Sequence, residues 1–168
     1  KEVLKTNTLF NGKETKQLEQ EFSKYNRSKY VKVVGNATQG LHLSLAALGF
    51  SSKDEASVPA FTWISTANVV EHLGGKVIFC DIDLSSFNID TNKIEPLVNK
   101  KTKAILPVHL FGLAANMQVI NSLAKDYKLW VIEDAACGFG SKIDNRHVGN
   151  FGDVGCFSFH PRKAITTG

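Results

Sequence analysis

Two residues that follow apolar, strand-like segments are the best placed in this sequence for covalent chemistry. Lys163 comes soon after residues 157–159, where partial loss of water around an amine lowers its pKa and makes it nucleophilic. Asp134 directly follows residues 129–133, where a carboxylate is costly to bury unless it faces a cation such as a protonated ring nitrogen. The ordinary alternatives are a solvated surface lysine, and an aspartate that caps a helix or forms a salt bridge.

Small, polar and aromatic residues follow other strand-like segments. Residues 35–40 lead into a helix whose first backbone N–H groups could approach an anion; the alternative is that Thr38 is simply the N-cap. Ser158 could donate its hydroxyl proton to a phosphate, and Trp63 could stack on a flat ring or be an ordinary core aromatic. Cys137 is interpreted as a small buried thiol, because no histidine or basic group can be placed beside it from the sequence.

Length and charge exclude several classes of protein. With 168 residues, 43% of them apolar, the chain is long enough for one globular domain with a sizeable core. The 20 basic and 16 acidic residues are interspersed, so we expect no nucleic-acid partner. No apolar run approaches the roughly 20 residues of a membrane helix, and the N-terminal residues lack a signal-peptide core. We therefore expect a soluble protein.

Cysteine, histidine and paired aspartates give no metal signature. Cys80, Cys137 and Cys156 are an odd set without CxxC spacing, which favours neither a disulfide framework nor a zinc site. The five histidines have no ligand-like spacing, and Asp81 and Asp83 are expected to cap a loop. We expect no metal site and a reducing, cytoplasmic location.

Helical and strand-like segments alternate along the chain. Helices are expected at residues 11–26, 38–48, from about 62 to the glycines at 74 and 75, 92–99 and 116–127. Strands are expected at residues 31–34, 56–59, 77–82, 104–109 and 129–133, with further β structure at 141–148 and 154–159. Several strands are apolar at consecutive positions, which is typical of a sheet covered on both faces. The prediction is an α/β fold with a mostly parallel, doubly wound sheet, helices on both faces and ligands at the carboxyl ends of the strands.

An ordered series of motifs resembles one family of enzymes. The segments are residues 12–22, 35–41, 59–68, 81–83, 107–112, 133–136 and 152–168, and the last contains a lysine signature at residues 158–168. In this order they resemble the DegT/DnrJ/EryC1/StrS family of sugar aminotransferases, which are pyridoxal-phosphate enzymes of type I fold. The resemblance covers essentially all 168 residues.

The resemblance implies a role for each candidate residue. Lys163 would carry the cofactor as a Schiff base, and Asp134 would pair with the pyridinium nitrogen. Trp63 would stack on the ring. Three residues would hold the phosphate: Thr38, Gln39 and Ser158. These roles agree with the chemistry, because such a site needs an attaching lysine and an acid that keeps the ring nitrogen protonated.

Two features depart from the family pattern. Cys137 stands where the family usually has glutamine or histidine, and a thiol is a poorer donor to the ring hydroxyl. The chain is also expected to be an incomplete cofactor-binding large domain, residues 1–168, without the small C-terminal domain. Activity of these residues alone is therefore not expected.

The leading hypothesis is an aminotransferase that moves an amino group, expected from glutamate, to a nucleotide-linked keto-sugar in deoxyamino-sugar or surface-polysaccharide biosynthesis. We expect a homodimer with the active site near the subunit boundary. One alternative is a sugar dehydratase of the same family, which lacks the anchoring lysine, so Lys163 argues against it. Another is a non-catalytic regulator or assembly module.

Overall fold

The computed structural model describes residues 2–6, 8 and 11–167. The chain divides into two compact units, Lys1–Val34 and Gly35–Gly168, each described here by itself. Among the described residues, no helix combines the length and the apolar character needed to cross a membrane.

The first unit contains two helices, α1 (Glu2–Lys5) and α2 (Lys13–Asn26). Helix α2 begins with Gly12 as its N-cap and ends at Arg27, which has a left-handed backbone. The strand predicted at residues 31–34 is wrong. Its backbone meets a side chain instead, because the Val33 N–H donates to the Glu19 carboxylate at 3.1 Å.

The second unit contains a five-stranded sheet in the order β2-β1-β3-β4-β7, and every pairing in it is parallel. The strands are β1 (Glu55–Pro59), β2 (Lys76–Cys80), β3 (Thr102–Ile105), β4 (Trp130–Asp134) and β7 (Val154–Cys156). Its helices are α3 (Ala37–Ala47), α4 (Ser65–His72) and α5 (Met117–Tyr127). This confirms the predicted parallel α/β fold.

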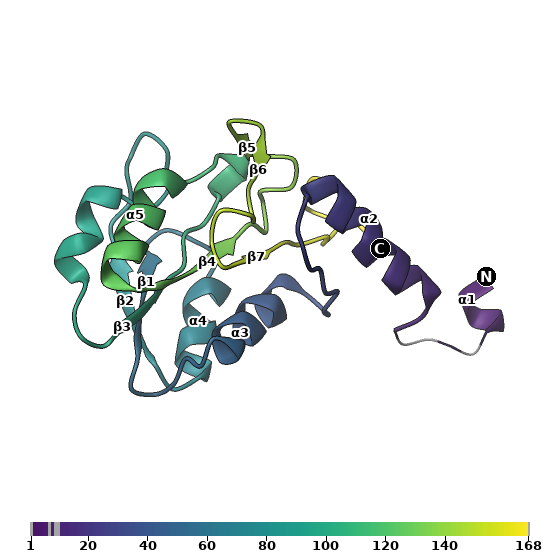
Figure 1. Cartoon of the computed structure of the whole chain (residues 1–168), viewed down its shortest axis with the longest axis horizontal. Helices are drawn as coiled ribbons and strands as arrows, with labels where there is room; N and C mark the ends of the chain where they lie inside the picture. The colour runs from purple at the N-terminus through teal and green to yellow at the C-terminus, as the bar shows by residue number, and fades with distance from the viewer. Residues whose placement is uncertain (1, 7, 9–10, 168) are drawn as a thin grey trace. The chain divides into compact units, whose positions relative to one another are not determined.

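Both faces of the sheet are covered. Successive strand residues point to opposite faces, so Ile132 packs in the core cluster shared with α3 and α4, whereas Val131 packs in the cluster shared with α5. Figure 1 shows α5 on one side of the sheet and α3 and α4 on the other. The same alternation sends the two carboxylates at the end of β4, Glu133 and Asp134, to opposite faces.

Several predicted elements are shorter or different. The helix predicted at 92–99 is wrong: η1 (Thr91–Lys93) and η2 (Glu95–Leu97) are short 3-10 turns, and Pro96 removes an N–H that a continuing helix would use. A third 3-10 turn is η3 (Leu110–Gly112). The β structure expected at 141–148 is an antiparallel hairpin of β5 (Lys142–Ile143) and β6 (Arg146–His147).

Candidate active site

The carboxyl ends of the parallel strands bring the main candidate residues to one edge of the sheet. Asp134 is the last residue of β4, and Cys156 is the last residue of the neighbouring strand β7, with Ser158 two residues further on. Cys137 follows β4 after a short turn, and the Lys163 amine lies against it. Ligands bind at this edge in open α/β sheets.

Asp134 is a buried carboxylate held by two neutral donors. Asp134 is only 4% exposed. The Thr66 hydroxyl donates to Oδ2 at 2.7 Å, and the Ala136 N–H donates to Oδ1 at 3.1 Å. Burial raises the pKa of Asp134, and the hydrogen bonds from Thr66 and Ala136 oppose that rise. A cation beside this carboxylate would offset its desolvation.

Lys163 lies beside Cys137. The Lys163 Nζ donates to the Cys137 Sγ at 3.1 Å, and both residues are half-buried. The Lys163 N–H donates to the His160 carbonyl at 2.8 Å, which forms a turn after β7. The sequence interpretation of Cys137 as a buried thiol without a basic neighbour is wrong, because the turn returns the lysine to it across 26 positions.

Ser158 lies between β7 and this turn. Its hydroxyl oxygen accepts the His160 N–H at 3.4 Å, and the residue is half-buried. A serine hydroxyl both accepts and donates, so this bond leaves its proton able to bind an anion.

The N-terminus of α3 is capped by Asn36, so the alternative of Thr38 as the N-cap is wrong. The Asn36 Oδ1 accepts the Gln39 N–H at 2.9 Å. The Gln39 side chain turns back and its Oε1 accepts the Gly35 N–H at 3.0 Å. Thr38 is the second helical residue and half-buried, and Gln39 is exposed. Helix α3 therefore presents its positive end beside two polar side chains.

Trp63 is 76% exposed, so the alternative of a core aromatic is wrong. Its carbonyl accepts the backbone N–H of Thr66 at 3.1 Å and lies 3.1 Å from the Thr66 hydroxyl oxygen. The hydroxyl has one proton, which it donates to Asp134 Oδ2, the nearer acceptor at 2.7 Å.

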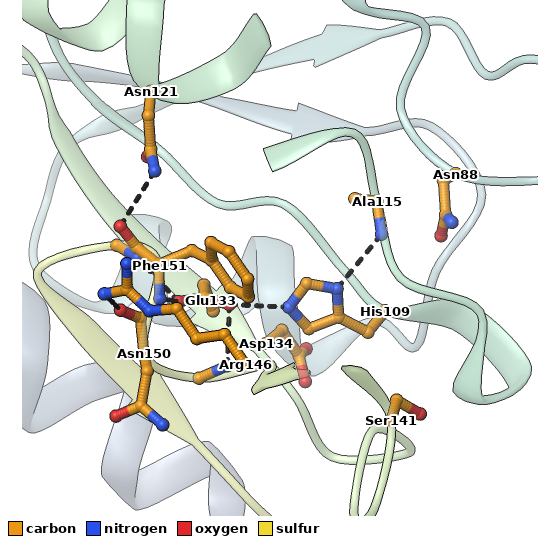
Figure 2. Close-up of polar contacts among 12 residues, drawn as sticks. Asn88, His109, Ala115, Asn121, Glu133, Asp134, Ser141, Arg146, Asn150 and Phe151 are labelled. Carbon is orange, nitrogen blue, oxygen red and sulfur yellow. Dashed lines mark hydrogen bonds and ion pairs between the residues drawn. The ribbon is translucent and has the colours of Figure 1, made fainter. Parts of the chain in front are cut away.

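Sequence reasoning missed three buried residues near the site: Thr66, His109 and Glu133. Glu133 Oε2 accepts from His109 Nε2 at 2.8 Å and from the Gly149 N–H at 2.7 Å (Figure 2). Its Oε1 accepts the N–H groups of Phe151 and Gly152, both at 2.6 Å. A carboxylate directly after the apolar run Trp130-Val131-Ile132 was the available signal, because a buried charge needs such partners.

The Glu133 network, which we define as this carboxylate and its donors His109, Gly149, Phe151 and Gly152, holds the segment that leads to the site. Residues 149–152 bind its carboxylate and run directly into β7, after which Ser158 and Lys163 follow. Asn121 of α5 also donates to the Phe151 carbonyl at 2.8 Å. Figure 2 shows the Asp134 carboxylate pointing away from this network.

Of the two aspartates after β2, Asp83 caps the following loop as predicted, whereas Asp81 binds a lysine further along the chain. Asp83 accepts from the Ser85 N–H and hydroxyl at 2.8 and 2.9 Å. Asp81 forms an ion pair with Lys93 at 2.7 Å. In the part of the chain that the structure describes, no group of three or more potential metal ligands comes together.

The profile of the DegT/DnrJ/EryC1/StrS aminotransferase family matches residues 1–168. A GDP-perosamine synthase of Escherichia coli O157:H7 is 43% identical over 157 residues, which are 94% of this chain and 43% of that protein. The chain therefore spans less than half the length of this relative.

Two solved structures are similar over nearly the whole chain. An aminotransferase from Psychrobacter cryohalolentis has a TM-score of 0.95 and 37% identity, covering 99% of this chain and 43% of that one. NtdA from Bacillus subtilis, with bound cofactor PMP, has a TM-score of 0.92 and 38% identity, covering 98% of this chain and 37% of that one.

Proposed function

Because the chain belongs to the DegT/DnrJ/EryC1/StrS aminotransferase family, we propose that it is the cofactor-binding large-domain part of a pyridoxal-phosphate-dependent sugar aminotransferase. One observation carries the proposal: the buried Asp134 carboxylate and the Lys163 amine, which lies against Cys137, belong to the same carboxyl edge of the sheet. These are the two groups that such chemistry requires.

The residues at this edge fit pyridoxal phosphate. Asp134 has two neutral donors and a pKa raised by burial, so a protonated ring nitrogen is the kind of partner that would stabilise its charge. Lys163 is a half-buried amine, and Ser158 and the N-terminus of α3 offer donors to a phosphate. The PMP bound to the Bacillus relative supports the same cofactor class.

Each residue has a distinct role in the proposal. When bound, pyridoxal phosphate supplies an electron sink for the carbon that loses a proton. Asp134 would hold the proton on the ring nitrogen, and Lys163 would attach the cofactor and then move a proton as a general acid and base. Trp63 would cover the ring. Thr38, Gln39 and Ser158 would bind the phosphate, and Cys137 would face the ring hydroxyl.

The substrates are proposed from the relatives. The named activity of the Escherichia coli relative supports a nucleotide-linked keto-sugar as the amino acceptor. The amino donor is an amino acid, which we propose to be glutamate. The product would enter deoxyamino-sugar or surface-polysaccharide biosynthesis. Three free cysteines are consistent with a reducing cytoplasm.

We also propose a homodimer with the active site near the subunit boundary. An exposed aromatic group supports an interface on the second unit: Phe61, Phe87 and Phe111 are 48%, 41% and 75% exposed. Their successive ring centroids lie 5.6 and 6.4 Å apart. Contiguous exposed apolar surface of this kind is typical of interaction sites. Sedimentation of the active protein tests this, and an active monomer would contradict it.

Peptide mapping tests the proposed function. The purified protein is loaded with pyridoxal phosphate, reduced with borohydride and digested, and mass spectrometry locates the label. We expect the label on Lys163, its loss in Lys163→Ala, and its retention in the control Lys142→Ala, which changes an exposed lysine of β5. A label on another lysine would overturn the site.

Addition of glutamate separates the remaining functions. This test uses the full-length protein. An aminotransferase releases the lysine when glutamate donates its amino group, so glutamate added before borohydride should remove the label from Lys163. A dehydratase without an attaching lysine would give no Lys163 label at all. A loaded full-length protein that keeps its label with every amino donor would indicate the regulator instead.

A further inference from the structure

Cys137 and Lys163 form a close thiol–amine pair that the proposed reaction does not need. The Lys163 Nζ lies 3.1 Å from the Cys137 Sγ and donates a hydrogen bond to it. Both residues are half-buried, so a small reagent can reach them from solvent. We propose that, while no cofactor is attached to Lys163, a hydroperoxide such as hydrogen peroxide converts this pair into a sulfur–nitrogen cross-link.

The environment distinguishes Cys137 from the other two thiols. Cys80 is 0% exposed and Cys156 is 6% exposed, and burial raises the pKa of each to about 11. Those thiols stay protonated and shielded. Cys137 is instead half-buried, and its sulfur accepts a hydrogen bond from the Lys163 Nζ at 3.1 Å. Oxidation is therefore expected to select Cys137.

The reaction has two balanced steps. First, the Cys137 sulfur attacks one peroxide oxygen, the O–O bond breaks and the departing oxygen takes the thiol proton as water, so sulfur is oxidised and peroxide is reduced. The product is a sulfenic acid. Second, Lys163 releases its extra proton to solvent and its nitrogen attacks the sulfur. The S–O bond breaks, and the hydroxyl leaves with one amine proton as a second water.

The position of Lys163 favours this second step over reaction of the sulfenic acid with another thiol. A sulfenic acid condenses with the nucleophile that reaches it first, and the amine already touches the sulfur before oxidation. The other two cysteines are buried, Cys80 at the end of β2 and Cys156 at the end of β7. The link would consume the Lys163 amine, to which the cofactor attaches in the proposed function. This consequence rests on the proposed function, whereas formation of the link does not.

Mass spectrometry of the cofactor-free protein tests the link itself. After mild peroxide treatment and digestion without reductant, we expect peptides joined through Cys137 and Lys163, lighter by two hydrogen atoms than their sum. A thiol reductant should restore both peptides. The joined peptide should be lost in Cys137→Ser and in Lys163→Arg, and kept in the control Lys142→Arg.

Two further arms separate this inference from the proposed function. Peroxide treatment in concentrated urea should oxidise Cys137 without the link, because the pair no longer meets. Prior loading with pyridoxal phosphate should suppress the link if Lys163 carries the cofactor. A link that forms equally with and without cofactor supports the pair but counts against the proposed function. Oxidised Cys137 without a link in the folded protein, or a joined peptide that retains a peroxide oxygen, would overturn the inference.

Discussion

The Glu133 carboxylate and the His109 ring share a 2.8 Å hydrogen bond in which neither side chain is exposed. His109 Nδ1 accepts the Ala115 N–H at 3.1 Å, so Nδ1 carries no proton and Nε2 is the nitrogen that donates to Glu133. Three backbone N–H groups complete the four donors to this carboxylate.

Glu133→Gln should destabilise the fold substantially. An amide has one acceptor oxygen, so its NH₂ group would face two of the donors that now bind the carboxylate. Two unsatisfied buried donors cost roughly 2–6 kcal/mol together. Urea unfolding monitored by circular dichroism measures the loss in the free energy of unfolding.

The control for this prediction is Glu95→Gln. Glu95 is exposed and accepts one hydrogen bond, from the Tyr127 hydroxyl at 2.6 Å. The same chemical change there should alter the free energy of unfolding by no more than about 0.5 kcal/mol. Equal effects of the two substitutions would show that the Glu133 network does not carry the stability assigned to it.

The sheet could be predicted because its physical signal is local. Strands β2 and β4 are apolar on consecutive residues, at 77–79 and 130–132, and α3 and α4 cover one face of the sheet while α5 covers the other. The segment at residues 31–34 has the same β-branched character, yet a strand also needs a neighbouring strand. Its backbone N–H at Val33 meets the Glu19 carboxylate instead.

The site could be predicted residue by residue but not as a set of contacts. Asp134 and Lys163 were identifiable because each follows an apolar strand. The Thr66 hydroxyl reaches Asp134 across 68 positions, and Lys163 reaches Cys137 across 26. No spacing rule links residues that far apart, because the crossover helix and the turn after β7 set those distances.

Gly155→Ala should also destabilise the fold. A methyl group at Gly155, in the middle of β7, would overlap the Cα and the carbonyl of Gly149. That segment cannot move freely, because the Gly149 N–H is bound to Glu133. Overpacking of this kind costs typically ~1–3 kcal/mol, measured by thermal or urea unfolding.

Gly35→Ala is the matched control. The atom that a methyl group would meet there is the amide oxygen of Gln39, the end of a flexible and exposed side chain. We expect the free energy of unfolding to change by about 0.5 kcal/mol or less. A Gly155→Ala variant as stable as this control would mean that residues 149 and 155 do not pack as described.

Asp134→Asn should change how stability depends on pH in the cofactor-free protein. Burial raises the pKa of Asp134 above its ordinary value of 3.8, so the folded chain binds this proton more tightly than the unfolded chain. Stability from the protonated group is complete below 3.8 and is lost as pH rises through the folded-state pKa. The variant has no carboxyl proton to lose. The difference between its free energy of unfolding and that of the parent should therefore increase from pH 3.8 up to the folded-state pKa of Asp134, and then level off. Parallel pH profiles would contradict the burial of an ionisable group.

Thr66→Val extends the same test to the hydrogen bond that opposes burial. Valine has nearly the shape of threonine but cannot donate to Asp134 Oδ2, which Thr66 now contacts at 2.7 Å. This bond is the largest of the effects that lower the pKa of Asp134, so its loss should move that pKa further upward and extend the unstable window to higher pH. Above the window the ionised carboxylate loses a hydrogen bond worth roughly 1.5–3 kcal/mol.

Thr62→Val is the control. It makes the same chemical change at a hydroxyl that contacts Thr66, at 3.1 Å, and not the Asp134 carboxylate. It should leave the pH profile of unfolding close to that of the parent. The decisive comparison is the double variant Thr66→Val/Asp134→Asn. Without a carboxylate to bind, loss of the Thr66 hydroxyl should no longer change how stability depends on pH. The effects of the two substitutions on the free energy of unfolding should therefore be non-additive at high pH. Additive effects at every pH would show that Thr66 stabilises the fold without acting on Asp134.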